Sequence, residues 1–348
     1  MALYRFLDAV YFGDVHSHSN DQDASLLPQR RGRDSDYTDR AVSTTKTVRQ
    51  NRRRKPYAST SGGDGWTEHV SKGLRILQVP KLAKIPWLVH GFSTRPGGVS
   101  DLEGQKVCNL GFAEWDAREN VLENRRRFVG ALGGDQFSLA ALKQVHSDVV
   151  HYFEIHPCDP RHGDASVTNR PGLLLAVQTA DCVPILLVDT RRRAVAAVHA
   201  GWRGTLRRIV MKAVGKMTMQ FGSRAADILA ALGPAIGGCC YEVGTEVAVE
   251  FQSQFSGAPE WFDELRTGDE PNPLQWLNMK PPGHQPPPRN VLLDLRKANR
   301  SQLLAAGVRP YNIHASDLCT ACRRDLLFSY RKEGPRSGRL MAVIGIRA

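Results

Sequence analysis

Three apolar runs follow one another between residues 172 and 200, and they constrain the fold more than any other part of the sequence. The runs are GLLLAVQTA (172–180), CVPILLVDT (182–190) and RRAVAAVHA (192–200). Apolar runs of this length with polar boundaries are typical of β-strands. Polar residues interrupt the longest apolar region, from Leu173 to Val188, and it is too short to span a bilayer. We therefore expect strands of a globular core and no membrane span.

Helical patterns alternate with further strand-like runs from about residue 74 onward. Apolar residues recur at helical spacing after Gly204, with Thr205 as the expected N-cap and Gly222 as the expected C-terminal cap. Helices are expected over 204–222, 244–255 and 291–308, and strands over 226–236 and 338–347. Interleaved strands and helices indicate a single domain of the α/β or α+β class over residues 74–348.

Residues 1–73 differ from the rest of the chain. They contain few aliphatic clusters, and the segment 46–55 (KTVRQNRRRK) carries six basic residues and no acidic one. Such a segment cannot bury enough apolar surface to offset the entropy of ordering it. We expect a disordered basic extension, or sequence that lies upstream of the true start codon.

Charge and cysteine content restrict the partners and the compartment. The chain has 348 residues and a formal net charge of +12, which favours anionic partners such as nucleotides and phosphate. Many basic enzymes do not bind nucleic acid, so we do not expect it as a partner. Seven cysteines without a disulfide framework, and an N-terminus that lacks signal-peptide features, indicate reduced thiols and a cytoplasmic protein.

Cys182 and His199 face each other if the runs that carry them form a hairpin. With a turn centred on residues 190–191, Asp189 pairs with Arg192 and Cys182 pairs with His199. Directly opposed residues have Cβ atoms about 4.5–5.5 Å apart on one face. The thiolate and the imidazole could then share a metal ion or form a catalytic dyad. A shift of the turn centre by half a residue would place them on opposite faces.

His146, in LKQVHSDVVHYF, is a third candidate ligand because it lies just before another strand-like run. Two histidines and one cysteine with an open fourth position are typical of a catalytic zinc site. Such a zinc ion lowers the pKa of its bound water to about 7. The alternative is that these side chains are ordinary core or hydrogen-bonded residues.

Substrate-binding candidates lie in two glycine-containing loops. In AVHAGWRG (197–204), Trp202 could stack on a ring and Arg203 could hold a phosphate or carboxylate. Arg95, in FSTRPGGVS (92–100), is a second candidate for an anion. The alternatives are that Trp202 packs on a helix and Arg203 pairs with a surface acid. Asp164 is the candidate general base, or a partner that orients a metal ligand.

The remaining cysteines carry weaker signals. The segment 319–322 (CTAC) is a single CxxC pair, and the sequence has no second one, so a structural zinc site is not expected and a redox role is the alternative. Cys239 and Cys240 are adjacent, and we interpret them as buried structural thiols.

Seven motifs in order resemble the laccase-domain family, also called multicopper polyphenol oxidase or zinc-dependent purine nucleoside phosphorylase. They are HGFSTRPGGVS, LKQVHSDVV, GDASVTNRPGLLLAVQTADCVPILLVD, AVHAGWRGT, GPAIGGCCYEVG, DLCTACRRDLLFSYRKEG and GRLMAVIGI, and they span about residues 74–348. The resemblance implies one α/β (α+β) domain of the type shared with the cytotoxic-necrotizing-factor catalytic domain, with mixed β-sheets covered by helices. It also implies a Zn²⁺ site, with copper as the alternative metal, formed by His146, Cys182 and His199.

The same resemblance implies an activity. It indicates phosphorolysis of adenosine, inosine, guanosine and 5′-methylthioadenosine, together with adenosine deamination. We expect a monomer or homodimer. The alternatives are a cysteine- or metal-dependent amidase that edits peptidoglycan precursors, and a copper-dependent polyphenol oxidase. Residues 74–348 contain eight histidines and no HxH pair, which disfavours a cupredoxin-type multicopper oxidase.

Overall fold

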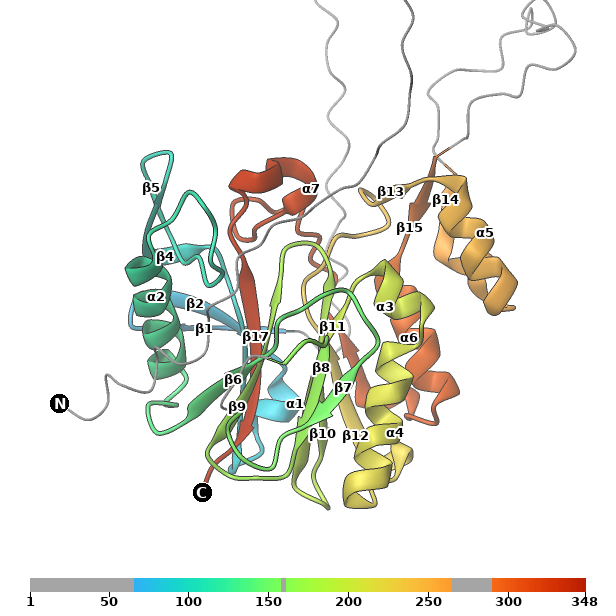
Figure 1. Ribbon diagram of the computed structural model, residues 1–348, viewed down its shortest axis with the longest axis horizontal. Helices are drawn as coiled ribbons and strands as arrows, with labels where there is room; N and C mark the ends of the chain where they lie inside the picture. The colour runs from blue at the N-terminus through green and yellow to red at the C-terminus, as the bar shows by residue number, and fades with distance from the viewer. Residues whose placement is uncertain (1–65, 158–160, 265–289) are drawn as a thin grey trace, which may run out of the picture. The chain divides into compact units, whose positions relative to one another are not determined.

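Two six-stranded sheets form the framework of the chain (Figure 1). The computed structural model describes residues 66–157, 161–264 and 290–348. The order of the first sheet is β1-β2-β3-β17-β9-β6, and only the β6–β9 pair is parallel. Its strands are β1 (Thr67–Ser71), β2 (Leu74–Gln78), β3 (Leu88–Ser93), β17 (Leu340–Ile346), β9 (Leu173–Thr179) and β6 (Ser138–Ala141).

The second sheet carries the hairpin of the apolar runs at its centre. Its order is β16-β12-β10-β11-β8-β7, with parallel pairing only at the two edges. Its strands are β16 (Ile313–Ala315), β12 (Ile228–Leu232), β10 (Val183–Asp189), β11 (Ala194–Ala200), β8 (Ala165–Thr168) and β7 (Val150–Tyr152). The three apolar runs thus form strands, as predicted, but β9 belongs to the first sheet, and β10 and β11 to the second.

Smaller elements complete the fold. A three-stranded sheet is formed by β13 (Glu242–Val243), β15 (Val291–Leu293) and β14 (Phe262–Glu264), and a two-stranded one by β4 (Pro96–Leu102) and β5 (Gln105–Val107). The helices of the described residues are α1 (Pro80–Ala83), α2 (Arg118–Ala131), α3 (Trp202–Leu206), α4 (Ile209–Phe221), α5 (Thr245–Gln254), α6 (Leu295–Ala305) and α7 (Tyr330–Glu333).

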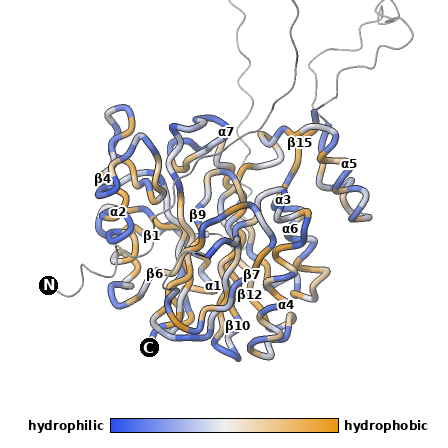
Figure 2. The backbone as a smooth tube through the Cα atoms, viewed as in Figure 1, coloured by the Kyte–Doolittle hydropathy of each residue, from blue (hydrophilic) through white to orange (hydrophobic). Residues whose placement is uncertain are grey.

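The second sheet is buried on both faces, which explains its uninterrupted apolar sequence. Ile185 and Leu187 of β10 pack on the side of α4 and α6. The alternate residues, Leu186 and Val188, pack against the first sheet, including Ile344 of β17. Successive side chains of a strand point to opposite faces, so two covered faces require apolar residues at every position. Figure 2 shows hydrophobic residues along these interior strands.

The helix expected over 204–222 is two helices. Gly201, not Thr205, precedes α3, and Thr205 lies inside that helix. Arg208 has a φ of 63°, which is incompatible with a continuous right-handed helix and separates α3 from α4. The cap at Gly222 is confirmed, with a φ of 67° at the end of α4.

The helix expected over 291–308 begins later than the sequence indicated. Residues 291–293 form β15, in the middle of the small sheet. Asp294 then caps α6, because its side chain accepts hydrogen bonds from the backbone N–H groups of Arg296 and Lys297. The helix over 244–255 and the strands over 226–236 and 338–347 are confirmed by α5, β12 and β17.

The centre of the hairpin turn lies one residue later in the sequence than predicted. Val183 pairs with Ala200, and Pro184 pairs with His199, so Cys182 is not directly opposite His199. Because the turn centre moves by a whole residue, each residue of β10 pairs two positions further along β11 than predicted. A shift of two positions keeps every side chain on the same face of the sheet. Cys182, just before β10, and His199 remain on the same face as diagonal neighbours.

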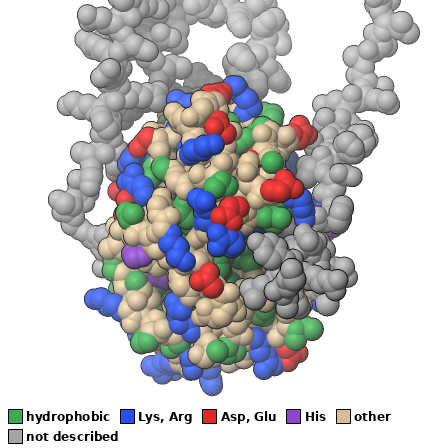
Figure 3. Space-filling view, turned by 90° about the vertical axis from the view of Figure 1, so that its left-hand side faces the viewer, with side chains coloured by type: hydrophobic (Ala, Val, Ile, Leu, Met, Phe, Trp, Pro, Cys, Tyr) green, Lys and Arg blue, Asp and Glu red, His purple; other side chains and the backbone are tan. Residues whose placement is uncertain are grey.

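The first described strand lies upstream of the boundary expected at residue 73, because β1 spans Thr67–Ser71. The expectation of a disordered extension falls mainly on residues 1–65, which lie outside the described residues. Among the described residues, no helix has the length and apolar character needed to cross a membrane. Figure 3 shows Lys and Arg side chains scattered over one face with Asp and Glu among them, so on that face they form no single basic patch.

Candidate metal centre and active site

Three side chains from separate segments meet at one end of the second sheet. His146 lies in the loop between β6 and β7, Cys182 just before β10, and His199 near the end of β11. One ligand atom of each lies within 4.8 Å of those of the other two. The Cys182 Sγ is 3.8 Å from the His146 Nε2, and the two imidazole rings have centroids 5.0 Å apart. His146 is exposed and His199 is buried, so the group opens to solvent on the side of His146.

Asp164 holds two of these three side chains in place. Its Oδ1 accepts a hydrogen bond from the His199 Nδ1 at 2.8 Å and one from the His146 backbone N–H at 3.0 Å. Its Oδ2 accepts from the backbone N–H and the hydroxyl of Ser147, at 2.6 and 2.7 Å. These bonds stabilise the loop in which His146 adopts a φ of 57°. They also leave the Nε2 of His199 as the ring nitrogen that faces Cys182.

Gly201 makes the close approach of the ligands possible. A Cβ at this position would lie 2.9 Å from the Cδ2 of His146 and 3.0 Å from the Sγ of Cys182. The φ of Gly201 is −76°, which any residue can adopt, so the requirement is for space rather than for backbone freedom. Its place between His199 and Trp202 is the one local signal in the sequence for this glycine, because its role depends on side chains from two other segments.

The electrostatics of the group favour a thiolate and an imidazolium. Burial alone would raise the pKa of Cys182, but the charge of His199 and the hydrogen bond from His146 outweigh it and lower that pKa to about 6. Burial likewise opposes the charged form of His199, yet the Cys182 thiolate and Asp164 raise its pKa to about 9. Burial would raise the pKa of Asp164, but the hydrogen bonds from His199 and Ser147 outweigh this effect and lower that pKa to about 2.

Asp181 fixes the backbone that presents Cys182. It has a φ of 95°, which is strained for a residue with a Cβ. Its side chain accepts hydrogen bonds from the Thr320 hydroxyl and the Arg331 backbone N–H, both at 2.6 Å. Thr320 and Arg331 lie far along the chain, and no local signal pointed to them.

Trp202 and Arg203 follow the ligand strand directly. The Trp202 ring is half-buried against the core that α4 covers, and the Arg203 guanidinium lies 4.6 Å from the centroid of that ring. Arg203 is exposed. Trp202 therefore packs on the helical layer, and the Arg203 guanidinium lies above the face of its ring. Because Arg203 is exposed, an anion from solvent could contact its guanidinium.

Arg95 is already partnered. Its guanidinium forms an ion pair with Glu333, in which each side chain is 13% exposed, and lies 5.1 Å from the centroid of the Phe328 ring. An anion would therefore have to compete with Glu333 for it.

A family model described as multi-copper polyphenol oxidoreductase laccase matches residues 89–347. The chain belongs to this laccase-like family. The match confirms the resemblance drawn from the seven motifs. It also includes every residue of the metal group and both loops that carry the substrate-binding candidates.

Members of the laccase-like family carry purine-related names. A purine nucleoside phosphorylase of Deinococcus radiodurans is 39% identical over 279 residues, which cover 80% of this chain and 95% of that protein. An adenosine deaminase, RL5, from an unidentified prokaryote is 35% identical over 265 residues, which cover 74% and 93%. The crystal structure of YlmD from Geobacillus stearothermophilus matches with a TM-score of 0.67 at 31% identity, over 82% of this chain and 100% of that one. The mixed α/β fold is thereby confirmed.

A second cysteine group differs from the sequence expectation. Cys239 is exposed and Cys240 half-buried, so these are not the buried thiols that we expected. They lie beside Cys319 and Cys322 of the CTAC segment, and the four Sγ atoms lie within 4.8 Å of one another. The CxxC pair thus meets an adjacent Cys–Cys pair. The sequence expectation considered only a second CxxC motif as its partner, and Cys239–Cys240 lacks that spacing.

Proposed function

We propose that this chain is a zinc-dependent purine nucleoside phosphorylase that also deaminates adenosine. The proposed substrates are adenosine, inosine, guanosine and 5′-methylthioadenosine, with phosphate as the second substrate. The observation that carries the proposal is the solvent-facing group of His146, Cys182 and His199. The names of the similar proteins support purine chemistry at this group.

The donor set fits zinc. With Zn–S near 2.3 Å and Zn–N near 2.0–2.1 Å, a tetrahedral site separates S and N by about 3.6 Å, close to the 3.8 Å between Cys182 and His146. Three protein ligands leave a fourth position for water or substrate. When bound, zinc supplies a Lewis acid and lowers the pKa of a coordinated water to about 7. Copper accepts the same donors and is the alternative metal.

For Asp164 we propose a positioning role rather than that of general base. Both of its oxygens already accept hydrogen bonds, from His199, Ser147 and the backbone of His146. The carboxylate orients the imidazole of His199 and increases its basicity as a ligand.

Phosphorolysis breaks the bond between the purine nitrogen and the anomeric carbon, and a phosphate oxygen forms the new bond to that carbon. The bonding electron pair leaves with the purine, which takes up a proton. The reaction therefore needs a cation to hold phosphate, and the exposed guanidinium of Arg203 is suited to this. We propose that Trp202 contacts the purine or ribose, and that Arg95 contributes only if it exchanges Glu333 for the phosphate.

Incubation with adenosine, with and without phosphate, tests the activity. Release of adenine and pentose 1-phosphate only when phosphate is present supports phosphorolysis. Appearance of inosine without phosphate supports deamination. Loss of activity together with one zinc per chain in Cys182→Ala, with neither lost in Cys108→Ala, supports the ligand role, because Cys108 is a buried cysteine outside the group. A protein that is inert in both assays would overturn the proposal.

A second candidate is a cysteine-dependent amidase, such as one that edits peptidoglycan precursors. The observation that favours it is geometric: the Cys182 Sγ and a ring nitrogen of His199 lie within 4.8 Å of each other, and Asp164 orients the imidazole. Such an enzyme would keep its activity after removal of zinc by a chelator and would form an acyl-enzyme at Cys182. The phosphorylase would lose activity on chelation and regain it with zinc.

We further propose a cytoplasmic enzyme, monomeric or homodimeric, with no role for membranes or nucleic acid. The six cysteines among the described residues are all free, which supports a reducing compartment. Light scattering after size-exclusion chromatography would measure the oligomeric state.

A further inference from the structure

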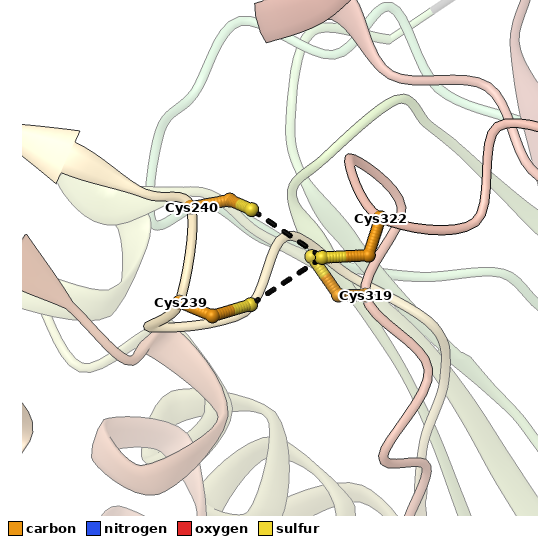
Figure 4. Close-up of side chains that lie close together, drawn as sticks. All are labelled: Cys239, Cys240, Cys319 and Cys322. Atoms are coloured by element: carbon orange, nitrogen blue, oxygen red, sulfur yellow. Dashed lines mark hydrogen bonds between the residues drawn. The ribbon is translucent and has the colours of Figure 1, made fainter. Parts of the chain in front are cut away.

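Four cysteines from two loops converge in a group separate from that of His146, Cys182 and His199 (Figure 4). Cys239 and Cys240 lie in the turn before β13, and Cys319 and Cys322 lie in the loop after β16. Figure 4 shows all four side chains directed toward one another. The Sγ of Cys322 is 3.7 Å from that of Cys239 and 3.5 Å from that of Cys240.

These separations fit one tetrahedral metal ion. Four sulfurs at about 2.3 Å from a central zinc are about 3.8 Å from one another. All four Sγ atoms lie within 4.8 Å of one another, which leaves no room between them for several irons and sulfides. A tetrahedral set of four thiolates is the arrangement of a closed, structural zinc site.

The surroundings of the cysteines suit a bound metal with its thiolates. The backbone N–H of Gly237 donates to the Sγ of Cys319 at 3.2 Å. A Cβ on Gly237 would lie 3.1 Å from the Sγ of Cys239 and 3.0 Å from a guanidinium nitrogen of Arg296. Four thiolates and one Zn²⁺ carry a net charge of −2, and the nearby Arg296 partly offsets it.

We propose that Cys239, Cys240, Cys319 and Cys322 bind a structural zinc ion that is distinct from the metal at Cys182. The zinc joins two loops that are about 80 residues apart in the sequence. Without it, backbone hydrogen bonds link the two loops near the cysteines, from the Thr320 N–H to the Ala235 carbonyl and from the Ala235 N–H to the Leu318 carbonyl, and the described cysteines form no disulfide between them. The alternatives are a disulfide between the loops, an iron–sulfur cluster, and unmetallated thiols.

The joined loops hold the backbone next to Cys182. Thr320, between the two cysteines of CTAC, donates to the Asp181 carboxylate at 2.6 Å. Ile236, just before the Cys–Cys loop, donates its backbone N–H to the Asp181 carbonyl at 2.9 Å. Both loops thus contact the strained residue that precedes Cys182. The structural zinc therefore positions Cys182 without touching a substrate.

Metal analysis of the full-length chain tests the proposal. We expect Cys239→Ser/Cys322→Ser to bind one zinc per chain fewer than the unmodified protein, while Cys108→Ala binds the same number. Cys239 and Cys322 are exposed, so their replacement leaves no cavity in the core. An unchanged zinc content in the double variant would overturn the proposal. Iron with acid-labile sulfide, or an intact mass lower by two hydrogens under native conditions, would also overturn it.

Cobalt substitution gives a second measurement that does not depend on either the double variant or the proposed activity. In Cys182→Ala, the four-cysteine group is the one remaining thiolate site that the described residues offer for a metal. We expect cobalt-loaded Cys182→Ala to keep strong thiolate-to-cobalt absorption, and zinc to displace it. Absence of this absorption would overturn the proposal, whether or not the protein acts on nucleosides. Conversely, an inactive protein with this absorption would refute only the proposed function.

Discussion

The Nδ1 of His199 lies 2.8 Å from the Oδ1 of Asp164, and both side chains are buried. This bond fixes the imidazole so that Nε2 faces Cys182, and the same carboxylate holds the backbone of the loop that carries His146. One buried carboxylate thus couples two ligands that are 53 positions apart in the chain.

Replacing Asp164 tests this coupling. Asp164→Asn keeps the shape of the side chain but removes its charge and one acceptor, so both ligands lose part of their support. We expect zinc affinity to fall by about 10–100-fold, measured by competition with a chelator. Asp148→Asn is the matched control, because Asp148 lies in the same loop as His146 and its carboxylate pairs with Lys212 of α4. Equal affinities in the two variants would contradict the positioning role.

The space at Gly201 gives a second prediction. In Gly201→Ala the new Cβ would displace His146 or Cys182, and a displacement of about 1 Å can cost about 100-fold in rate. We expect weaker zinc binding and a large drop in kcat. In the control Gly215→Ala the Cβ meets nothing within 4 Å and lies in α4, so stability should rise by up to about 1 kcal/mol with activity unchanged. A Gly201→Ala protein with normal zinc binding would refute the steric argument.

Arg203 is predicted to bind phosphate. Loss of a charged hydrogen bond costs about 1.5–3 kcal/mol, so Arg203→Ala should raise the KM for phosphate by about 10–100-fold. The KM for the nucleoside should change less. Arg207→Ala is the control, because Arg207 is also exposed and follows α3. If both variants raise the phosphate KM equally, the effect comes from the positive charge of this surface, and the predicted contact between Arg203 and phosphate is refuted.

The metal-stripped protein should show a reactive thiolate. The pKa of Cys182 is lowered to about 6 chiefly because the charge of His199 outweighs burial, so alkylation of Cys182 should have its midpoint near pH 6. Peptide mapping by mass spectrometry would follow this residue alone, and bound zinc should protect it. A midpoint near the ordinary thiol value of about 8.5 would contradict the ion pair.

The same pair predicts how stability depends on pH in the metal-stripped protein. The lowered pKa of Cys182 gives stability that is lost as the pH falls through about 6. The raised pKa of His199 gives stability that is lost as the pH rises through about 9. The free energy of unfolding of the unmodified chain, relative to Cys182→Ala, should therefore be greatest between about pH 6 and 9, as chemical denaturation would measure.

Local patterns in the sequence were sufficient for much of the fold. The apolar runs predicted β9, β10 and β11, and Gly222 predicted the end of α4. These patterns did not predict element boundaries that depend on the backbone conformation of one residue or on pairing between distant strands. Arg208 divides the expected helix through its left-handed conformation, and residues 291–293 join a sheet whose other strands lie elsewhere in the chain.

The sequence by itself determined the membership of the chain in the laccase-like family, the mixed α/β class and the three candidate ligands, because these depend on residue types in a fixed order. Only the tertiary structure decided how residues distant in the chain meet. It placed Asp164 against His199, left space for the ligands at Gly201, and brought the Cys–Cys pair to the CTAC loop. The physical reason is that side-chain contacts between separate loops follow from how the sheets pack, and local periodicity carries no information about that packing.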